Sequence, residues 1–208
     1  EHLENKGLIS HKGTIVDAPR QRNSRDENNK IKNGEIPEEW EKPENKSKLA
    51  QKDTDADWTK KNGERHFGYK DHVKCDADSK LITNYSVTSA SVHDSQRCLV
   101  FIGQEDEVLY ADSAYSGKPI ALALPENCKN QICEKGYRNS PLTSEQKMNN
   151  RRKSRIRCRI EQIFGFMTGA MHGITIRSIG ITRAWMNIGI TNLVYNFCRY
   201  SYLKRASA

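Results

Sequence analysis

The order of the elements that hydrophobic patterning predicts constrains this chain more than any other feature. A short β-branched strand over Gly13–Ala18 comes first, and an antiparallel hairpin of His66–Cys75 and Leu81–Ser89 follows it. After an intervening helix, another apolar strand covers Glu107–Ala114. Strands that alternate with helices in this way favour an α/β fold, with a mixed sheet flanked by helices.

Four helices are expected among and after these strands. The first opens at Ser91, with Asp94 three residues later in a capping-box arrangement, and is expected to bury its apolar side chains, Leu99 and Val100 among them. A short helix is predicted over Pro119–Leu124. The two longer ones cover Thr143–Met167, which is basic at first and apolar later, and Ile181–Leu203, whose aromatic residues are expected to pack in the core. The aromatic residues concerned are Trp185, Tyr195, Phe197, Tyr200 and Tyr202.

The stretch from residue 20 to residue 63 is polar and departs from this pattern. It is too long for a plain connection and too poor in apolar residues to form a core. We therefore expect a polar insertion loop over the surface after the first strand, with Trp40 and Trp58 as anchors.

The chain carries 34 Lys and Arg against 26 Asp and Glu, a formal net charge of +8. Such a balance favours a polyanionic partner, although ordinary solubility charge accounts for it equally well. Seven basic residues precede Glu161 on one predicted helix without an acid among them: Lys147, Arg151, Arg152, Lys153, Arg155, Arg157 and Arg159. Their mutual repulsion favours contact with DNA phosphates over a merely solvated helix face.

Six cysteines occur without a Cys-x-x-Cys pair, which argues against a structural zinc site and favours free thiols in a reducing cytosol. No secretory signal or transmembrane run is visible, so no membrane partner is expected. The first residue is not Met, and we expect that an N-terminal region precedes this segment.

Three acids occupy positions that suit a metal site. Asp17 and Asp112 lie at the carboxyl ends of predicted strands, where ligands of open α/β sheets gather, and Glu161 lies at the edge of an apolar helix face. Converging carboxylates are ligands that Mg²⁺ accepts. Each acid also has an ordinary alternative, because Asp often forms turns or caps, and Glu161 could simply pair with Arg157 one turn earlier.

Six blocks occur in an order that closely resembles bacterial insertion-sequence transposases of the insertion-sequence-five type, in the DDE superfamily. They are G-T-I-V-D-A-P from residue 13, H-F-G-Y-K-D-H-V from 66, S-A-S-V-H-D-S from 89, Y-A-D-S-A-Y from 110, G-Y-R-N-S-P-L-T from 136 and R-C-R-I-E-Q-I-F-G from 157. The resemblance implies one RNase H-like catalytic domain over residues 1–208, without the family's N-terminal region that binds transposon ends.

The resemblance also implies the site. Asp17, Asp112 and Glu161 would be the catalytic and metal-binding triad, holding two Mg²⁺ or Mn²⁺ ions, and Arg157 matches the Arg of the family's Tyr-Arg-Glu-Lys signature. Ser154 and Thr168 stand where that signature has Tyr and Lys. His93 and Asp94, which recur in the family's Val-His-Asp block, are possible supporting residues, although capping gives Asp94 a structural role.

The expected partner is double-stranded DNA, as transposon ends and as target, bound by a homodimer in the bacterial cytoplasm at the nucleoid. Three alternatives stay open at this point. The chain could be an inactive DNA-binding remnant of a transposase, or an RNase H-like nuclease that does not transpose. A metal-dependent hydrolase of small substrates is disfavoured by the basic helix.

Overall fold

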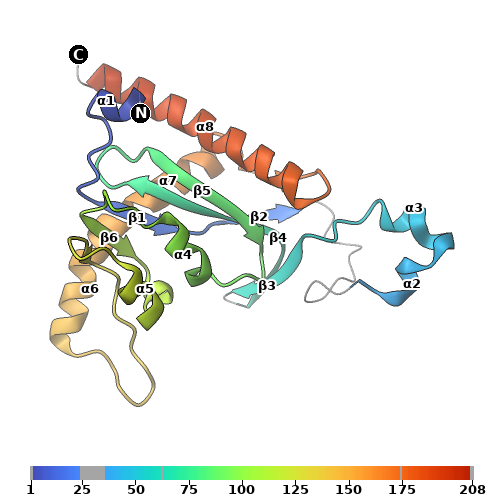
Figure 1. Cartoon of the computed structure of the whole chain (residues 1–208), viewed down its shortest axis with the longest axis horizontal. Helices are drawn as coiled ribbons and strands as arrows, with labels where there is room; N and C mark the ends of the chain where they lie inside the picture. The colour runs from blue at the N-terminus through green and yellow to red at the C-terminus, as the bar shows by residue number, and fades with distance from the viewer. Residues whose placement is uncertain (1, 24–35, 62, 174, 207–208) are drawn as a thin grey trace.

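The chain folds around a central mixed sheet, which contains both parallel and antiparallel strand pairs. The computed structural model describes residues 2–23, 36–61, 63–173 and 175–206. The longest strand, β4 (Glu64–Asp76), pairs antiparallel with β5 (Ile82–Ser89) on one edge and with β1 (Thr14–Asp17) on the other. β6 (Val108–Ala111) is parallel to β1, and β7 (Lys129–Asn130) is parallel to β6. The predicted mixed sheet is confirmed (Figure 1).

Helices cover both faces of this sheet. On one face, α7 (Arg159–Gly169) and α8 (Ile181–Ala206) pack against apolar residues of β1, β4 and β5. On the other face, α4 (Ser95–Phe101) and α5 (Lys118–Ala123) bury side chains against β1 and β6. The predicted flanking helices are therefore confirmed (Figure 1).

The polar stretch after β1 contains more structure than one loop. Its first residues form β2 (Arg20–Asn23), which continues along the edge of β4 beyond β1, and β8 (Thr175–Ile176) pairs with β2. Its last residues form β3 (Asp57–Lys61), which pairs with the opposite edge of β4. Main-chain hydrogen bonds hold these strands, so they need few apolar side chains, and the apolar content of the sequence could not indicate them.

Between β2 and β3, a small helical segment projects away from the sheet (Figure 1). It comprises α2 (Glu38–Glu41), the 3₁₀ turn η2 (Pro43–Asn45) and α3 (Lys46–Leu49). Both predicted anchors make contacts: Trp40 is buried with Lys52 5.4 Å from its ring centroid, and Trp58 packs on Phe67 with ring centroids 5.3 Å apart. Residues 24–35 of the predicted insertion lie outside the described residues.

Two helix predictions need correction. The helix predicted from Ser91 begins at Ser95, and it buries Cys98 and Phe101 while Leu99 and Val100 are exposed. Contact with the sheet, which a sequence pattern does not contain, decides that orientation. The long helix predicted over Thr143–Met167 is divided at Cys158 into α6 (Ser144–Arg157) and α7. A Thr143–Gln146 capping box starts α6, which has no buried residue, whereas α7 buries three.

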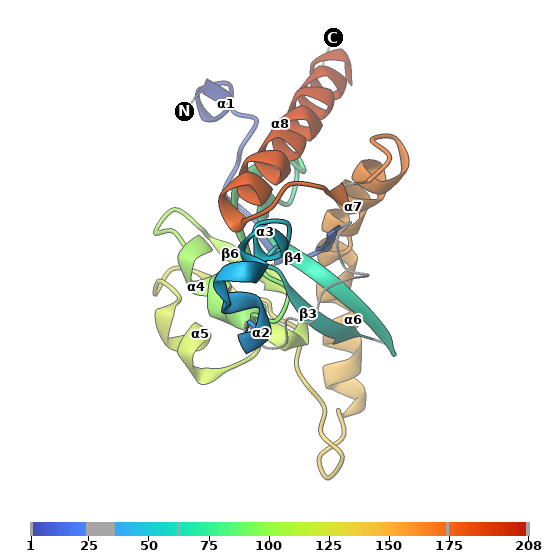
Figure 2. The same ribbon diagram turned by 90° about the vertical axis from the view of Figure 1, so that its right-hand side faces the viewer.

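The prediction that the aromatic residues of α8 form core is wrong for most of them. Tyr195 is buried, but Trp185, Phe197 and Tyr202 expose between 41% and 62% of their surface. The 26-residue helix extends past the sheet (Figure 2), and these three side chains lie on parts of it that the described residues leave exposed. Near its C-terminal end lies α1 (His2–Asn5), and Lys6 donates a hydrogen bond to Tyr200. No helix among the described residues is both long and apolar enough to cross a membrane.

Candidate active site

The register of the parallel pair β1–β6 brings the first two predicted acids together. Val16 lies opposite Ala111 across this pair, and both side chains are buried on the α4–α5 face. Asp17 and Asp112 are the next residues along the two chains, so they follow at the same carboxyl end of neighbouring strands. Side chains alternate between the two faces of a sheet, and adjacent strands lie about 4.8 Å apart. The Asp17 and Asp112 positions are therefore neighbours on the face of the sheet that α7 covers.

Packing of α7 places the third acid at the same end of the sheet. Ile160, Ile163 and Met167 are buried against Ile15 and Val73, as the apolar periodicity predicts. Glu161 follows Ile160 directly, so it lies at the edge of this contact with 56% of its side chain exposed.

Arg157 contacts two of the acids, Asp17 and Glu161. Its Nη2 donates to Glu161 at 2.7 Å, and its Nη1 lies 3.5 Å from a carboxylate oxygen of Asp17. Burial lowers the pKa of Arg157, but the charges of Asp17, Glu161 and Asp112 outweigh it and raise the pKa overall. Arg157 thus contacts Asp17 as well as Glu161, so the simple helix pair considered for Glu161 is part of a larger group.

Asp112 ends β6 and starts the 3₁₀ turn η3 (Ser113–Tyr115), where its carboxylate accepts hydrogen bonds from the backbone and hydroxyl of Ser113. The turn buries Tyr115, whose hydroxyl has no hydrogen-bond partner among the described residues. Burial raises the pKa of Tyr115, and the charges of Asp17, Asp94 and Asp112 raise it further. Tyr115 is thus buried with Val16 and Ala111, which directly precede Asp17 and Asp112, and only its place three residues after Asp112 in the Y-A-D-S-A-Y block could have indicated this.

The two possible supporting residues have different environments. Asp94 forms an ion pair of 2.8 Å with Lys70, whose ammonium also donates to the Val92 carbonyl at 2.6 Å. The side chain of Asp94 makes no capping hydrogen bond to α4, so its structural role is this ion pair. His93 is exposed, and its Nδ1 lies 2.7 Å from the hydroxyl of Ser95.

The acidic group has the chemistry of a divalent-cation site. Asp17, Asp112 and Glu161 offer carboxylate oxygens from three separate elements at an open end of the sheet, which suits a hard cation that keeps some of its waters. Their ligand atoms are not all within 4.8 Å of one another. Among the described residues, the set of three that meets this spacing is His11, Glu105 and Asp106, where Lys74 already pairs with both acids. The Arg157 guanidinium contacts both Asp17 and Glu161.

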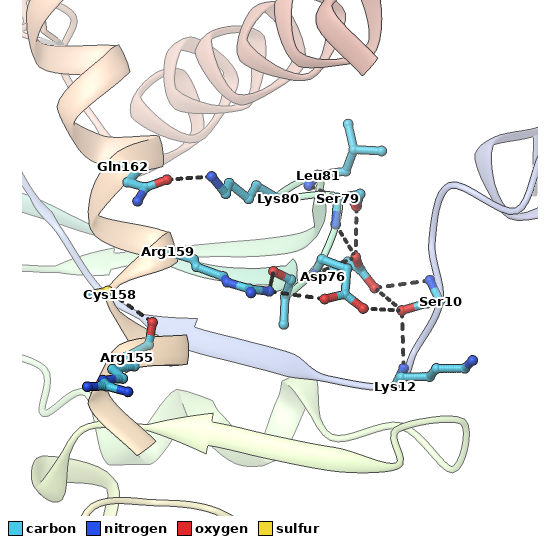
Figure 3. A network of polar contacts seen from close by, with 12 residues as sticks. Ser10, Lys12, Asp76, Ser79, Lys80, Leu81, Arg155, Cys158, Arg159 and Gln162 are labelled. Atoms are coloured by element: carbon cyan, nitrogen blue, oxygen red, sulfur yellow. Dashed lines mark hydrogen bonds and ion pairs between the residues drawn. The ribbon is translucent and has the colours of Figure 1, made fainter. Parts of the chain in front are cut away.

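The seven basic residues fall into two groups. Lys153 donates to the Ile132 carbonyl at 2.9 Å, and Arg157 is engaged by the acids. Arg159 donates to Ala77 and pairs with Asp78 at 3.0 Å, which ties α7 to the β4–β5 turn (Figure 3). The other four are exposed and make no side-chain hydrogen bond or ion pair within the described residues: Lys147, Arg151, Arg152 and Arg155.

Comparison with known proteins gives two findings. Residues 11–197 match the family described as "Transposase DDE domain". The chain is also similar to the transposase for insertion sequence element IS1106 of Neisseria meningitidis serogroup B, with 34% identity over 117 residues. That alignment covers 55% of this chain and 40% of the relative, so the chain matches less than half of the relative's length. No solved structure matches.

Proposed function

Since the chain belongs to the transposase DDE domain family, we propose that it is the catalytic part of a DNA transposase that cuts DNA strands and joins them to a target. The observation that supports the proposal is that β1 and β6 end side by side at Asp17 and Asp112 and that Arg157 contacts both Asp17 and Glu161. The insertion-sequence-five type remains part of this proposal and rests on the six ordered sequence blocks.

In the proposed mechanism, Asp17, Asp112 and Glu161 hold two divalent ions, Mg²⁺ or Mn²⁺. When bound, such ions activate water or a 3′-hydroxyl and stabilise the leaving oxygen of a phosphodiester. Asp17 and Asp112 have positions fixed by the strand register, and Glu161 has its position fixed by the packing of α7. Arg157 orients Asp17 and Glu161 through direct contacts and keeps their like charges apart.

DNA would approach the acids along α6. The exposed cations Lys147, Arg151 and Arg155 follow one another at four-residue spacing, so they share one side of this helix, with Arg152 beside them. Four cations that make no ion pair or side-chain hydrogen bond within the described part of the chain suit contacts to the DNA backbone, which position a duplex without reading its sequence. We therefore assign the phosphate contacts to these four residues. An activity on DNA also implies a location at the bacterial nucleoid.

A homodimer is the proposed form on DNA, and α8 offers the surface for it. Four large apolar side chains on its outer face are each more than half exposed, and they follow at intervals of four, three and four residues: Met186, Ile190, Leu193 and Phe197. This is the spacing of a helix-to-helix seam. The seam carries no charge between Arg183 and Arg199, so two positively charged copies could meet there without direct repulsion.

The decisive experiment measures nicking and strand transfer on labelled DNA with Mg²⁺ or Mn²⁺, comparing the wild-type chain with Asp112→Asn. Activity should require the ion and fall by a factor of at least about 100 in the variant, since a metal ligand is removed. Glu126→Gln, an exposed acid elsewhere, is the matched control and should keep wild-type activity.

Other outcomes separate the alternatives. Cleavage without joining of a pre-cut end would favour a nuclease that does not transpose. Duplex binding without any cleavage would favour an inactive remnant. Nicking that survives Asp112→Asn undiminished would show that the acidic site has been assigned wrongly.

A further inference from the structure

A cavity lies between α7, α8 and the turn that joins β4 to β5, on a different side of α7 from Glu161. It encloses about 190 Å³, and its lining includes Lys80 from the turn, Gln162 and Phe166 from α7, and Arg199 and Tyr202 from α8. Gln162 lines the cavity and directly follows Glu161 in the sequence. Consecutive helix residues point in different directions, so the cavity opens on a different side of α7 from the acidic site.

The cavity is positively charged. Neither an Asp nor a Glu belongs to its lining, and Lys80 has the neutral oxygen of Gln162 as its hydrogen-bond partner (Figure 3). Burial lowers the pKa of Lys80, and the charges of Arg199 and Arg159 lower it further. The acids of the turn are engaged elsewhere, since Asp76 accepts hydrogen bonds from Ser10 and Ser79. An entering anion would therefore relieve repulsion among cations.

The same cavity has aromatic walls. Phe166 and Tyr202 expose 39% and 56% of their surface. Tyr202 stacks under the Arg199 guanidinium at 4.9 Å, and Phe166 is held edge-on by Tyr195 with ring centroids 5.8 Å apart. Rings that are held in place and partly exposed suit the flat face of a base or the apolar side of a sugar.

We propose that this cavity is an accessory DNA site that binds one nucleotide unit of a strand outside the acidic centre. A backbone phosphate pairs with Lys80 and Arg199, and the adjoining sugar packs on Phe166 and Tyr202. The inference rests on the proposed function in one respect, that the polyanion is DNA. It follows that DNA contacts α7 on two sides, at Glu161 and at this cavity, in addition to its contacts with α6.

Cys198 provides a direct test because it lines the cavity and is exposed, while Cys75, Cys98, Cys128 and Cys133 are buried. The rate of Cys198 alkylation by a maleimide, read by mass spectrometry on the full chain, is measured with and without a 30-base-pair duplex and without divalent ions. At saturating duplex, the rate should fall at least about 5-fold, because bound DNA closes the cavity.

The variant Lys80→Gln should still bind the duplex through α6 but should show less than about 2-fold protection of Cys198. Lys48→Gln on the distant helix α3 is the matched control and should keep full protection. Tyr202→Ala, a change at the surface, gives a second variant that should also reduce protection if Lys80→Gln fails to fold.

Three results would overturn the inference, and they differ in what else they affect. If the wild-type chain binds no duplex, the proposed function fails together with the accessory site. If the duplex binds while Cys198 reacts at an unchanged rate, the accessory site alone is wrong. If Lys80→Gln and Tyr202→Ala are protected as strongly as the wild type, Cys198 is covered by another copy of the chain and not by DNA in this cavity.

Discussion

Among single residues, Arg157 contacts one acid that is close to it in the sequence and one that is distant. Its contact with Glu161 follows from helix geometry, because residues four apart face each other. Its contact with Asp17, 140 residues away in the chain, depends on how α7 packs on β1. A basic residue that serves two acids in this way is not free for DNA, which explains why the basic run divides as it does.

Asp71 is a second informative residue, and it lies on the α8 side of β4. Its carboxyl group is fully buried, with Asn192 donating to one oxygen at 3.3 Å. The other Asp71 oxygen and the Asn192 carbonyl oxygen both have no partner among the described residues. If Asp71 carries a proton, it can donate to that amide oxygen, so one proton would satisfy both atoms.

We predict that the Asp71→Asn variant is more stable than the wild type at pH 8, with a smaller difference at pH 5. Burial raises the pKa of Asp71 to about 7, against 3.8 for the ordinary group, and the hydrogen bond from Asn192 lowers it only in part. The folded state therefore holds a proton that the unfolded state releases as pH rises from 4 to 7. Stability from this group is fully present below pH 4 and declines toward pH 7, by at most about 1.4 kcal/mol per pH unit.

Urea unfolding of both proteins at the two pH values measures this difference. Comparing the variant with the wild type cancels other groups, including buried His72, whose pKa burial lowers to about 4 and whose pH dependence has the opposite sign. A stability difference that is equal at pH 5 and pH 8 would contradict the prediction.

At the scale of elements, the division of the basic helix at Cys158 separates two roles. α6 buries no residue and presents four of its cations to solvent, whereas α7 packs into the core and carries Glu161. The pattern of basic and then apolar residues indicated this change of role. It could not locate the break, because residues on both sides of Cys158 have helix-compatible sequences and only the second part packs into the core.

We predict that Arg151→Gln and Arg155→Gln each weaken duplex binding and reduce its dependence on salt. Removing one phosphate contact should lower the slope of log K against log salt concentration by about 0.9. Fluorescence anisotropy with a labelled duplex at several salt concentrations gives this slope. The comparison variant is Arg205→Gln at the end of α8, whose slope should equal that of the wild type. Unchanged slopes in both α6 variants would remove this helix from the DNA-contact surface.

At the scale of the whole molecule, α8 has two apolar faces. One packs on β4 and β5 through Ala184, Ile188 and Tyr195, and the opposite face carries the exposed seam. Exposed apolar patches of this kind on a charged, otherwise polar protein usually mark contact surfaces. A symmetric dimer would bury the seam against its own copy, which is the commonest arrangement in homo-oligomers.

We predict that the wild-type chain associates with a mass of twice 23.8 kDa at tens of micromolar, and that Leu193→Glu shifts it to the monomer. A buried glutamate on each side of the seam would be uncompensated, which disfavours the dimer strongly. Size-exclusion chromatography with light scattering measures the mass. Leu122→Glu, at an exposed position of α5, is the control and should leave the mass unchanged. A wild-type chain that stays monomeric at every concentration, with and without duplex, would exclude this surface as the dimer contact.

The sequence by itself determined the order of β1, β4, β5 and β6 with the helices that follow them, and the apolar side of α7, because these depend on local periodicity and on short blocks. The three acids that it singled out remain a prediction. It also determined the β4–β5 hairpin, whose partners are neighbours in the chain. Only the tertiary structure decided which residues of the polar stretch join β4, how α4 is turned and which cations stay exposed. Those properties depend on long-range backbone pairing and on competition for burial between elements, and neither leaves a local pattern in the sequence.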